Sequence, residues 1–191
     1  MSATIQPLTS QVANQYMIYD ARLTQPVSAQ WFSAAYWETS ASVERVGTGR
    51  GAAWFIHTQD DAYVLRHYRR GGLMAKISID RYVWRGLDRT RAWREWQLLA
   101  YIQACGLAAP APVAARVVRH GLLYTADILM RRIADSVALS QYLQQLPLYE
   151  QGWQAIGRCI REFHDRLVYH ADLNAHNILL NKQGKVCLLY T

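Results

Sequence analysis

The segment 169–180 constrains the fold of this chain more than any other part of its sequence. It begins with a polar loop that contains His170, Asp172 and Asn177, and it ends in the apolar run 178–180. A polar loop that leads directly into a short apolar run predicts a surface loop anchored at the start of a buried strand.

Apolar and turn patterns predict a sheet-rich first part of the chain and a more helical second part. The expected strands cover 46–56 (around a glycine-rich turn), 62–68, 116–120, 122–130, 178–180 and 186–189, and the expected helices cover 90–103, 136–146 and 149–166. The helix over 90–103 depends on Trp93, Trp96 and Leu99, which recur at helical spacing. Signals before Ser28 are weak, and Ser28 is expected to cap a short helix.

The composition is that of a folded protein with a basic surface. Hydrophobic residues make up 51% of the chain and charged residues 18%, which excludes a disordered chain. The net charge of +7 favours anionic partners without choosing among nucleic acid, lipid and phosphorylated substrates. The three cysteines form no C-x-x-C pair, so a reducing cytoplasm fits best. Neither a signal peptide nor a membrane span is expected.

The spacing of His170, Asp172 and Asn177 resembles the catalytic loop, H-x-D-x-x-x-x-N, of protein-kinase-like phosphotransferases. The resemblance implies that Asp172 accepts the proton of the attacking hydroxyl and that Asn177 binds Mg²⁺ through its amide oxygen. It also implies ATP as the phosphate donor. His170 is expected to brace the loop by hydrogen bonding. A turn rich in capping residues is the alternative explanation of the pattern.

A glycine-rich turn at 47–51 predicts a phosphate-binding loop. Gly47, Gly49 and Gly51 follow a G-x-G-x-G pattern between two expected strands, tighter than the usual G-x-G-x-x-G. Glycines let backbone amides approach phosphate oxygens closely. An ordinary hairpin turn would explain the same residues.

Arg66 and Glu95 are candidates for the ion pair that holds phosphate in kinases. Arg66 stands where the third strand of a kinase carries the Lys of V-A-I-K, and Glu95 lies on the following helix. Such a pair fixes the helix and the phosphate-contacting cation together. The alternatives are an exposed strand arginine and a solvated glutamate that pairs with Arg91 or Arg94.

A run of basic residues interleaved with aromatic residues extends from 66 to 94. It is either a solvated basic face or a patch for anionic lipid or a phosphosugar; it would also suit single-stranded nucleic acid, but the sequence carries no nucleic-acid motif, so no such partner is expected. The basic residues of the run are Arg66, Arg69, Arg70, Lys76, Arg81, Arg85, Arg89, Arg91 and Arg94.

Two longer segments resemble the Kdo kinases of the lipopolysaccharide core kinase family. They are L-R-H-Y-R-R-G-G at 65–72 and H-A-D-L-N-A-H-N-I-L-L at 170–180, and the likeness extends over about 31–189. The resemblance implies a peripheral enzyme at the cytoplasmic face of the bacterial inner membrane. This enzyme transfers the γ-phosphate of ATP to the 4-hydroxyl of Kdo, 3-deoxy-D-manno-octulosonic acid, on a lipid A precursor (Kdo-lipid IVA). A basic surface suits an anionic glycolipid in an anionic membrane.

The resemblance also implies an α+β, protein-kinase-like fold in two lobes. We expect a β-rich N-terminal lobe over 1–130 with one helix and the glycine-rich loop. A helical C-terminal lobe over 131–191 would carry the catalytic loop, and it is expected to be incomplete.

Tyr190 stands where the family has the first Asp of I-D-F-D, which binds Mg²⁺, and the chain given ends one residue later. Charge held by a metal stabilises a transition state by several kcal/mol. A loss of roughly 3–5 kcal/mol lowers a rate about 10²–10⁴-fold. We therefore expect a truncated chain with strongly reduced activity.

Three other functions stay open at this point. One is a heptose kinase of the same family, and another is a pseudokinase that binds nucleotide without turnover. The third, a basic nucleic-acid-binding domain, would show a steep salt dependence of binding. The oligomeric state is left open by the sequence.

Overall fold

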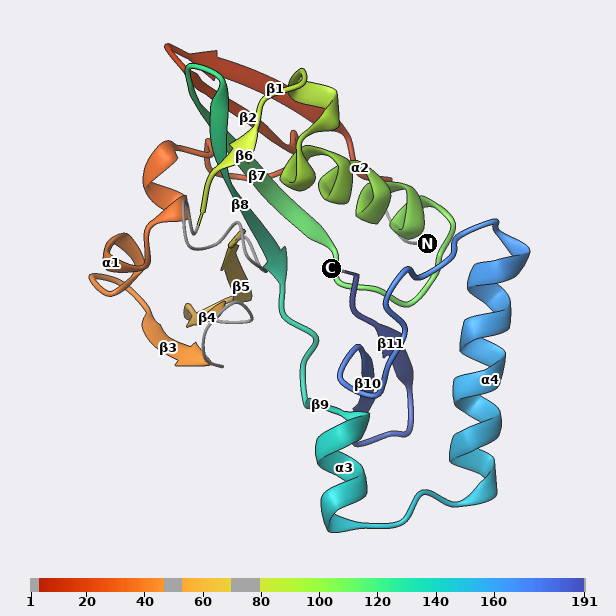
Figure 1. Cartoon of the computed structure of the whole chain (residues 1–191). Coiled ribbons are helices and arrows are strands. Elements are labelled where there is room, and N and C mark those ends of the chain that lie inside the picture. Colours follow the sequence, from red (N-terminus) through yellow and green to blue (C-terminus); the bar gives the residue numbers. More distant parts are fainter. Residues whose placement is uncertain (1–3, 47–52, 70–79, 191) are drawn as a thin grey trace. The chain divides into compact units, whose positions relative to one another are not determined.

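The computed structural model describes residues 4–46, 53–69 and 80–190, which fall into two units (Figure 1). We call them the sheet unit and the loop unit. The sheet unit comprises Ile5–Leu98 and Ala111–Arg132, and the loop unit comprises Met1–Thr4, Leu99–Pro110 and Ile133–Thr191.

An antiparallel sheet forms most of the sheet unit. Seven of its strands follow the order β1-β2-β7-β8-β5-β4-β3, and β6 pairs with β8 beside this path. The strands are β1 (Pro7–Val12), β2 (Gln15–Asp20), β3 (Ser42–Val46), β4 (Ala53–His57), β5 (Ala62–His67), β6 (Tyr82–Val83), β7 (Pro112–His120) and β8 (Leu123–Arg131). Among the described residues, two short helices lie between β2 and β3, η1 (Ala29–Phe32) and α1 (Ala34–Trp37), and η4 (Leu87–Arg89) follows β6.

The core of the sheet unit joins the short helices to the middle of the sheet. Trp31 and Trp37 belong to one buried apolar cluster with Leu65 and Leu129. Leu65 on β5 and Leu129 on β8 lie opposite each other in register. Burying an apolar side chain of this size stabilises the fold by roughly 1.5–3 kcal/mol. This packing therefore holds the neighbouring strands β5 and β8 in register.

Helix α2 (Arg91–Ala104) belongs to both units: its residues up to Leu98 are in the sheet unit, and those from Leu99 on are in the loop unit. Trp96 and Leu99 are buried, as their helical spacing predicts. The helix expected over 90–103 is confirmed to within one residue at each end. Gly106 follows it with a φ of +71°, a conformation that glycine adopts without strain and that commonly ends a helix.

The loop unit combines two helices with a small antiparallel sheet of order β11-β10-β9. Helix α4 buries Ile156, Cys159 and Phe163 along one side. The predicted hairpin over 178–189 is confirmed, and Gly184 in its turn has a φ of +75°. The elements are β9 (Ser136–Ala138), α3 (Leu139–Gln145), α4 (Glu150–Asp165), β10 (Ile178–Asn181) and β11 (Val186–Leu188).

The helix expected over 136–146 is wrong in its first turn. Residues 136–138 form β9, in which Ala138 pairs with Leu179 of β10, and the helix begins only at Leu139. The pairing partner lies some forty residues further along the chain, so local periodicity does not reveal it.

The N-terminal hairpin β1–β2 was not predicted. β1 leaves most of its side chains exposed, so it has no alternating apolar pattern for a sequence to display. The single short helix expected after Ser28 is divided into η1 and α1. Ser28 lies at the N-cap of η1, but its side chain makes no capping hydrogen bond.

The predicted α+β class is confirmed, with strands and helices in separate stretches of the chain rather than in regular alternation. None of the helices in the described part of the chain combines the length and the apolar character that a membrane crossing requires.

Candidate active site

Two hydrogen bonds of His170 hold the loop at 169–177, one within the loop and one to the chain after β11. Nδ1 of His170 accepts a hydrogen bond from the backbone N–H of Asp172 (3.1 Å), and Nε2 donates one to the backbone carbonyl of Leu189. The two bonds define a neutral imidazole with its proton on Nε2. His170 therefore ties the loop to the chain after β11, which is the bracing role expected from the sequence.

Two amides converge on one carbonyl inside this loop. The side-chain NH₂ groups of Asn177 and Asn174 both donate to the backbone oxygen of Asp172, at 2.8 and 3.2 Å. The backbone N–H of Asn177 donates in turn to the carbonyl of Asn174 (3.0 Å), and its own carbonyl accepts from Leu189 (2.8 Å). These hydrogen bonds therefore hold Asp172 and Asn177, which are five positions apart in the chain, close together in space.

The reactive oxygens of this pair are unengaged. Within the described residues, neither carboxylate oxygen of Asp172 nor the amide oxygen of Asn177 has a hydrogen-bond or ion-pair partner. Asp172 is exposed, whereas Asn177 is only 9% exposed. An exposed carboxylate can accept a proton, and a fixed amide oxygen is a suitable ligand for a hard cation.

A magnesium ion fits this arrangement without a preformed cage. The described ranges hold no group of three or more His, Cys, Asp or Glu side chains that could bind a metal. Mg²⁺ in phosphotransfer sites keeps several waters and takes only one or two protein oxygens together with substrate phosphates. The amide oxygen of Asn177 is free to be one such ligand because its NH₂ group is already bound to Asp172.

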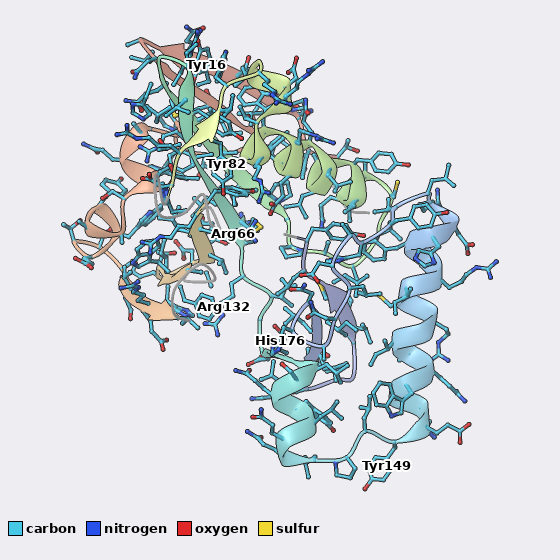
Figure 2. All side chains as sticks on the ribbon, in the orientation of Figure 1. Tyr16, Arg66, Tyr82, Arg132, Tyr149 and His176 are labelled. Carbon is cyan, nitrogen blue, oxygen red and sulfur yellow. The ribbon has the colours of Figure 1, made fainter. Side chains whose placement is uncertain are left out.

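Helix α3 begins against the same loop. The backbone N–H of Ser140 donates to the carbonyl of Ala175 (3.0 Å), and Ser140 Oγ lies 2.8 Å from Nδ1 of His176. His176, labelled in Figure 2, is exposed, so this contact orients its ring without burying it. The contact with Ser140 joins residues 36 positions apart, too far for a local pattern to predict.

In the sheet unit, Arg66 and Glu95 form an ion pair between β5 and α2. The side chain of Arg66 is 16% exposed and that of Glu95 is 9% exposed. Glu95 thus contacts the strand arginine rather than being a solvated partner of Arg91 or Arg94. Gly47, Gly49 and Gly51, the expected phosphate-binding glycines, lie outside the described residues.

Tyr68 completes the ion pair and was missed by the sequence argument. Its hydroxyl donates to Glu95 (2.5 Å) and lies 3.3 Å from a guanidinium nitrogen of Arg66. Burial and the charge of Glu95 together raise the pKa of Tyr68 well above its ordinary value, so it stays a donor. The signal was available, because residues two apart along an extended chain face the same side.

A second polar network involves His67, whose side chain points to the opposite face of β5 from that of Arg66. Asp127 on β8 is 3% exposed; it accepts from Arg116 of β7 (2.8 and 3.0 Å) and lies 2.7 Å from Nδ1 of His67 on β5. The hydrogen bond with Asp127 raises the pKa of His67, although burial partly opposes that rise. The network links three neighbouring strands, β7, β8 and β5.

Tyr190 is buried against the loop. Its ring stacks on Phe163 of α4, with centroids 5.7 Å apart, and lies 4.6 Å from the ring of His170. Burial, with a smaller effect from Cys159, raises the pKa of Tyr190 to about 12, so its hydroxyl stays protonated. A neutral phenol does not supply the metal-binding carboxylate that the family resemblance places at this position.

The fold and this loop together define a kinase-like protein. Among solved structures, the chain is similar to one titled "WaaP in complex with acyl carrier protein" with a TM-score of 0.53. The two are 18% identical, and the likeness covers 83% of this chain and 63% of that one. At that identity the comparison supports the fold alone.

Sequence comparison defines the family. Residues 34–189 match the Lipopolysaccharide kinase (Kdo/WaaP) family. A 3-deoxy-D-manno-octulosonic acid kinase of Vibrio cholerae is 40% identical over 177 residues, and that of Photobacterium profundum is 42% identical over 176. These matches cover 93% and 92% of this chain and 75% of each relative. A Haemophilus influenzae kinase of the same name is 40% identical over 183 residues, covering 92% of this chain and 76% of its own length. The chain belongs to the lipopolysaccharide kinase (Kdo/WaaP) family.

Proposed function

We propose that this protein is an ATP-dependent kinase that phosphorylates Kdo on a lipid A precursor. The observation that carries the proposal is the loop in which Asp172, exposed and unengaged, is fixed beside the amide oxygen of Asn177. The relatives named 3-deoxy-D-manno-octulosonic acid kinase, about 40% identical, support Kdo as the acceptor. We propose the 4-hydroxyl of that sugar as the site of phosphorylation.

Each proposed site residue has a distinct part in the reaction. Asp172 accepts the proton of the sugar hydroxyl and orients its oxygen toward phosphorus. Asn177 is a ligand of Mg²⁺, which neutralises charge on the ATP phosphates. Arg66 contacts a phosphate with the guanidinium face not used by Glu95, since a guanidinium carries five donors. Backbone amides at Gly47, Gly49 and Gly51 line the phosphates.

The cellular place of this reaction follows from its acceptor. A lipid A precursor is an anionic glycolipid in a membrane, and a net charge of +7 attracts the protein to an anionic surface. We propose a peripheral location on the cytoplasmic face of the bacterial inner membrane, where ATP is available.

A second candidate function is nucleotide binding without turnover. The observation in its favour is the buried, protonated phenol of Tyr190, the residue to which the family resemblance assigns a metal-binding carboxylate. A site with one protein ligand for the metal would still bind Mg²⁺-ATP, but it would stabilise the transition state less.

The deciding experiment offers the purified 191-residue chain two acceptors with Mg²⁺-ATP. One is Kdo-lipid IVA, and the other is a lipopolysaccharide core that exposes heptose but carries phosphorylated Kdo. We expect mass spectrometry to find one added phosphate on Kdo-lipid IVA and none on the heptose acceptor. Phosphate on heptose would assign the protein to the heptose kinases, and thermal stabilisation by ATP with no product from either acceptor would favour the second candidate.

A further inference from the structure

Two turns between strands and the segment that follows β6 meet at one end of the large sheet. The backbone N–H of Arg119 on β7 donates to Asn14 in the β1–β2 turn (2.9 Å), and the Asn14 side chain donates back to Arg119 (2.8 Å). The N–H of Trp84, just after β6, donates to Leu122 in the β7–β8 turn (2.9 Å). The two turns and the residues after β6 therefore lie side by side, as the upper end of the sheet in Figure 1 shows.

Large apolar side chains project from each of these connections. Val12 at the end of β1 is 65% exposed, Val83 on β6 is 50% exposed and Leu122 in the β7–β8 turn is 80% exposed. Single exposed apolar residues are ordinary, but here three of them lie on neighbouring segments at one end of the sheet, with Val83 in register with Leu123, next to Leu122. We call these residues, with the basic residues around them, the sheet-tip surface.

The residues around this cluster are mostly basic. Arg119 lies on β7, Arg81 directly precedes β6, and Arg85 and Arg91 follow β6 in the chain; all four are exposed. The nearby acids are Asp80, whose carboxylate lies 3.7 Å from His67, and the exposed Asp88. The basic run expected from 66 to 94 is thus divided, because Arg66 is buried in its ion pair while the arginines after 80 remain at the surface.

Aromatic rings support these arginines from beneath. Tyr16 stacks on Trp84 at 5.7 Å, and Trp84 meets the edge of Tyr124 at 6.2 Å. Arg119 lies 5.0 Å above the ring of Trp84, and Arg91 lies 5.1 Å above the ring of Tyr82. Figure 2 labels Tyr16 and Tyr82 at this end of the sheet. The rings hold the guanidinium groups of Arg119 and Arg91 in place, so less order has to be gained when these two charges bind a partner.

We propose that the sheet-tip surface docks the protein on an anionic lipid bilayer, with the apolar tips in the headgroup layer and the arginines on lipid phosphates. Apolar side chains surrounded by arginine and interfacial tryptophan are suited to a charged lipid surface more than to a folded acidic protein, which lacks a layer for such tips to enter. The inference depends on the proposed function, because that function places the acceptor in a membrane.

The test is co-sedimentation of the full chain with vesicles that contain no Kdo lipid, without ATP. We expect binding to phosphatidylcholine vesicles that contain phosphatidylglycerol and little binding to phosphatidylcholine alone. Leu122→Ser should weaken binding about tenfold. Leu167→Ser is the matched control, because Leu167 is also 80% exposed but lies in the loop unit, and it should bind like the wild type.

A second pair of variants tests the charges. Arg85→Gln should weaken binding to anionic vesicles about fivefold, whereas Arg45→Gln, which removes an exposed arginine from β3, should have little effect. Equal losses of vesicle binding in the test and control variants would overturn the assignment, as would binding that does not depend on phosphatidylglycerol. It would also be overturned if the Leu122 and Arg85 variants bound vesicles like the wild type but bound less to an acidic protein.

The phosphorylation of a water-soluble Kdo glycoside, measured in parallel, separates this inference from the proposed function. Leu122→Ser should phosphorylate the soluble sugar as fast as the wild type. Vesicle binding that fails while the glycoside is phosphorylated would overturn the sheet-tip surface alone.

Discussion

At the residue scale, the backbone of Asp172 is where the hydrogen bonds of the candidate site converge. Asn174 and Asn177 both donate to its carbonyl, and His170 accepts from the N–H of the same residue. These bonds restrain the backbone and leave the carboxylate free, which is the arrangement a general base requires. The motif therefore specifies its own geometry locally, and that is why it could be found from the sequence.

Asn177→Ala separates the two roles of this amide. Loss of its hydrogen bond should lower the free energy of unfolding by about 1 kcal/mol. Loss of the ligand should also abolish the extra thermal stabilisation that Mg²⁺ adds in the presence of ATP. Asn174→Ala, which removes a similar hydrogen bond, should keep that Mg²⁺ effect. Thermal unfolding with ATP, with and without Mg²⁺, measures both, and a full Mg²⁺ effect in Asn177→Ala would remove this residue from the metal site.

His67 should make the stability of the protein depend on pH. Its pKa in the folded state is raised, chiefly by Asp127 with help from Asp80, against burial and Arg69. A raised pKa means that the folded state holds the proton more tightly. Its stabilising effect is therefore complete below the ordinary value of 6.5 and is lost as the pH rises through the folded-state value.

The corresponding measurement is urea unfolding at about pH 6 and about pH 8.5, either side of the histidine titration. The wild type should lose more stability over this interval than His67→Gln. The exposed His120→Gln should behave like the wild type. Identical pH profiles for all three proteins would show that the proton of His67 is not coupled to folding.

At the element scale, the buried ion pair couples β5 to α2. Glu95→Gln should destabilise the fold by about 3 kcal/mol, because it leaves the guanidinium of Arg66 buried without its counter-charge. Glu44→Gln, an exposed change on β3, should stay within about 0.5 kcal/mol of the wild type. Chemical denaturation measures both changes.

The double variant Arg66→Met with Glu95→Leu gives the complementary result. Replacing both charges removes the penalty of an unpaired buried ion, so much of the lost stability should return while nucleotide binding does not. If the double variant lost more free energy of unfolding than the two single variants lose together, the two residues would not act as a pair.

The elements that could be predicted are those with local signals. Helix α2 showed its buried tryptophans at helical spacing, and the β10–β11 hairpin showed two apolar runs around Gly184. β1 and β9 could not be predicted, because each depends on a partner strand and not on an apolar stripe of its own. For the same reason, the sequence could not predict the network of His67, Arg116 and Asp127, because its members come from three different strands.

At the scale of the whole molecule, the proposed functional groups are distributed between the two units. Arg66, Tyr68 and Glu95 belong to the sheet unit, and Asp172 and Asn177 belong to the loop unit. Short motifs identified the family because each is contiguous in sequence. Tyr68 lies only two residues after Arg66, so strand alternation could have indicated it. The proposed sheet-tip surface is built from segments that are far apart in sequence, so it could be recognised only in the structure.

The most direct test of the central claim compares three proteins in phosphate transfer from ATP to Kdo-lipid IVA. The wild type should form phosphorylated product, if slowly. Asp172→Asn should lower the rate about 10²–10⁴-fold, the usual contribution of a general base. Asp165→Asn, an exposed change at the end of α4, should retain the wild-type rate. Phosphorylation that survives in Asp172→Asn, or that falls equally in both variants, would contradict the assignment of Asp172 as the catalytic base.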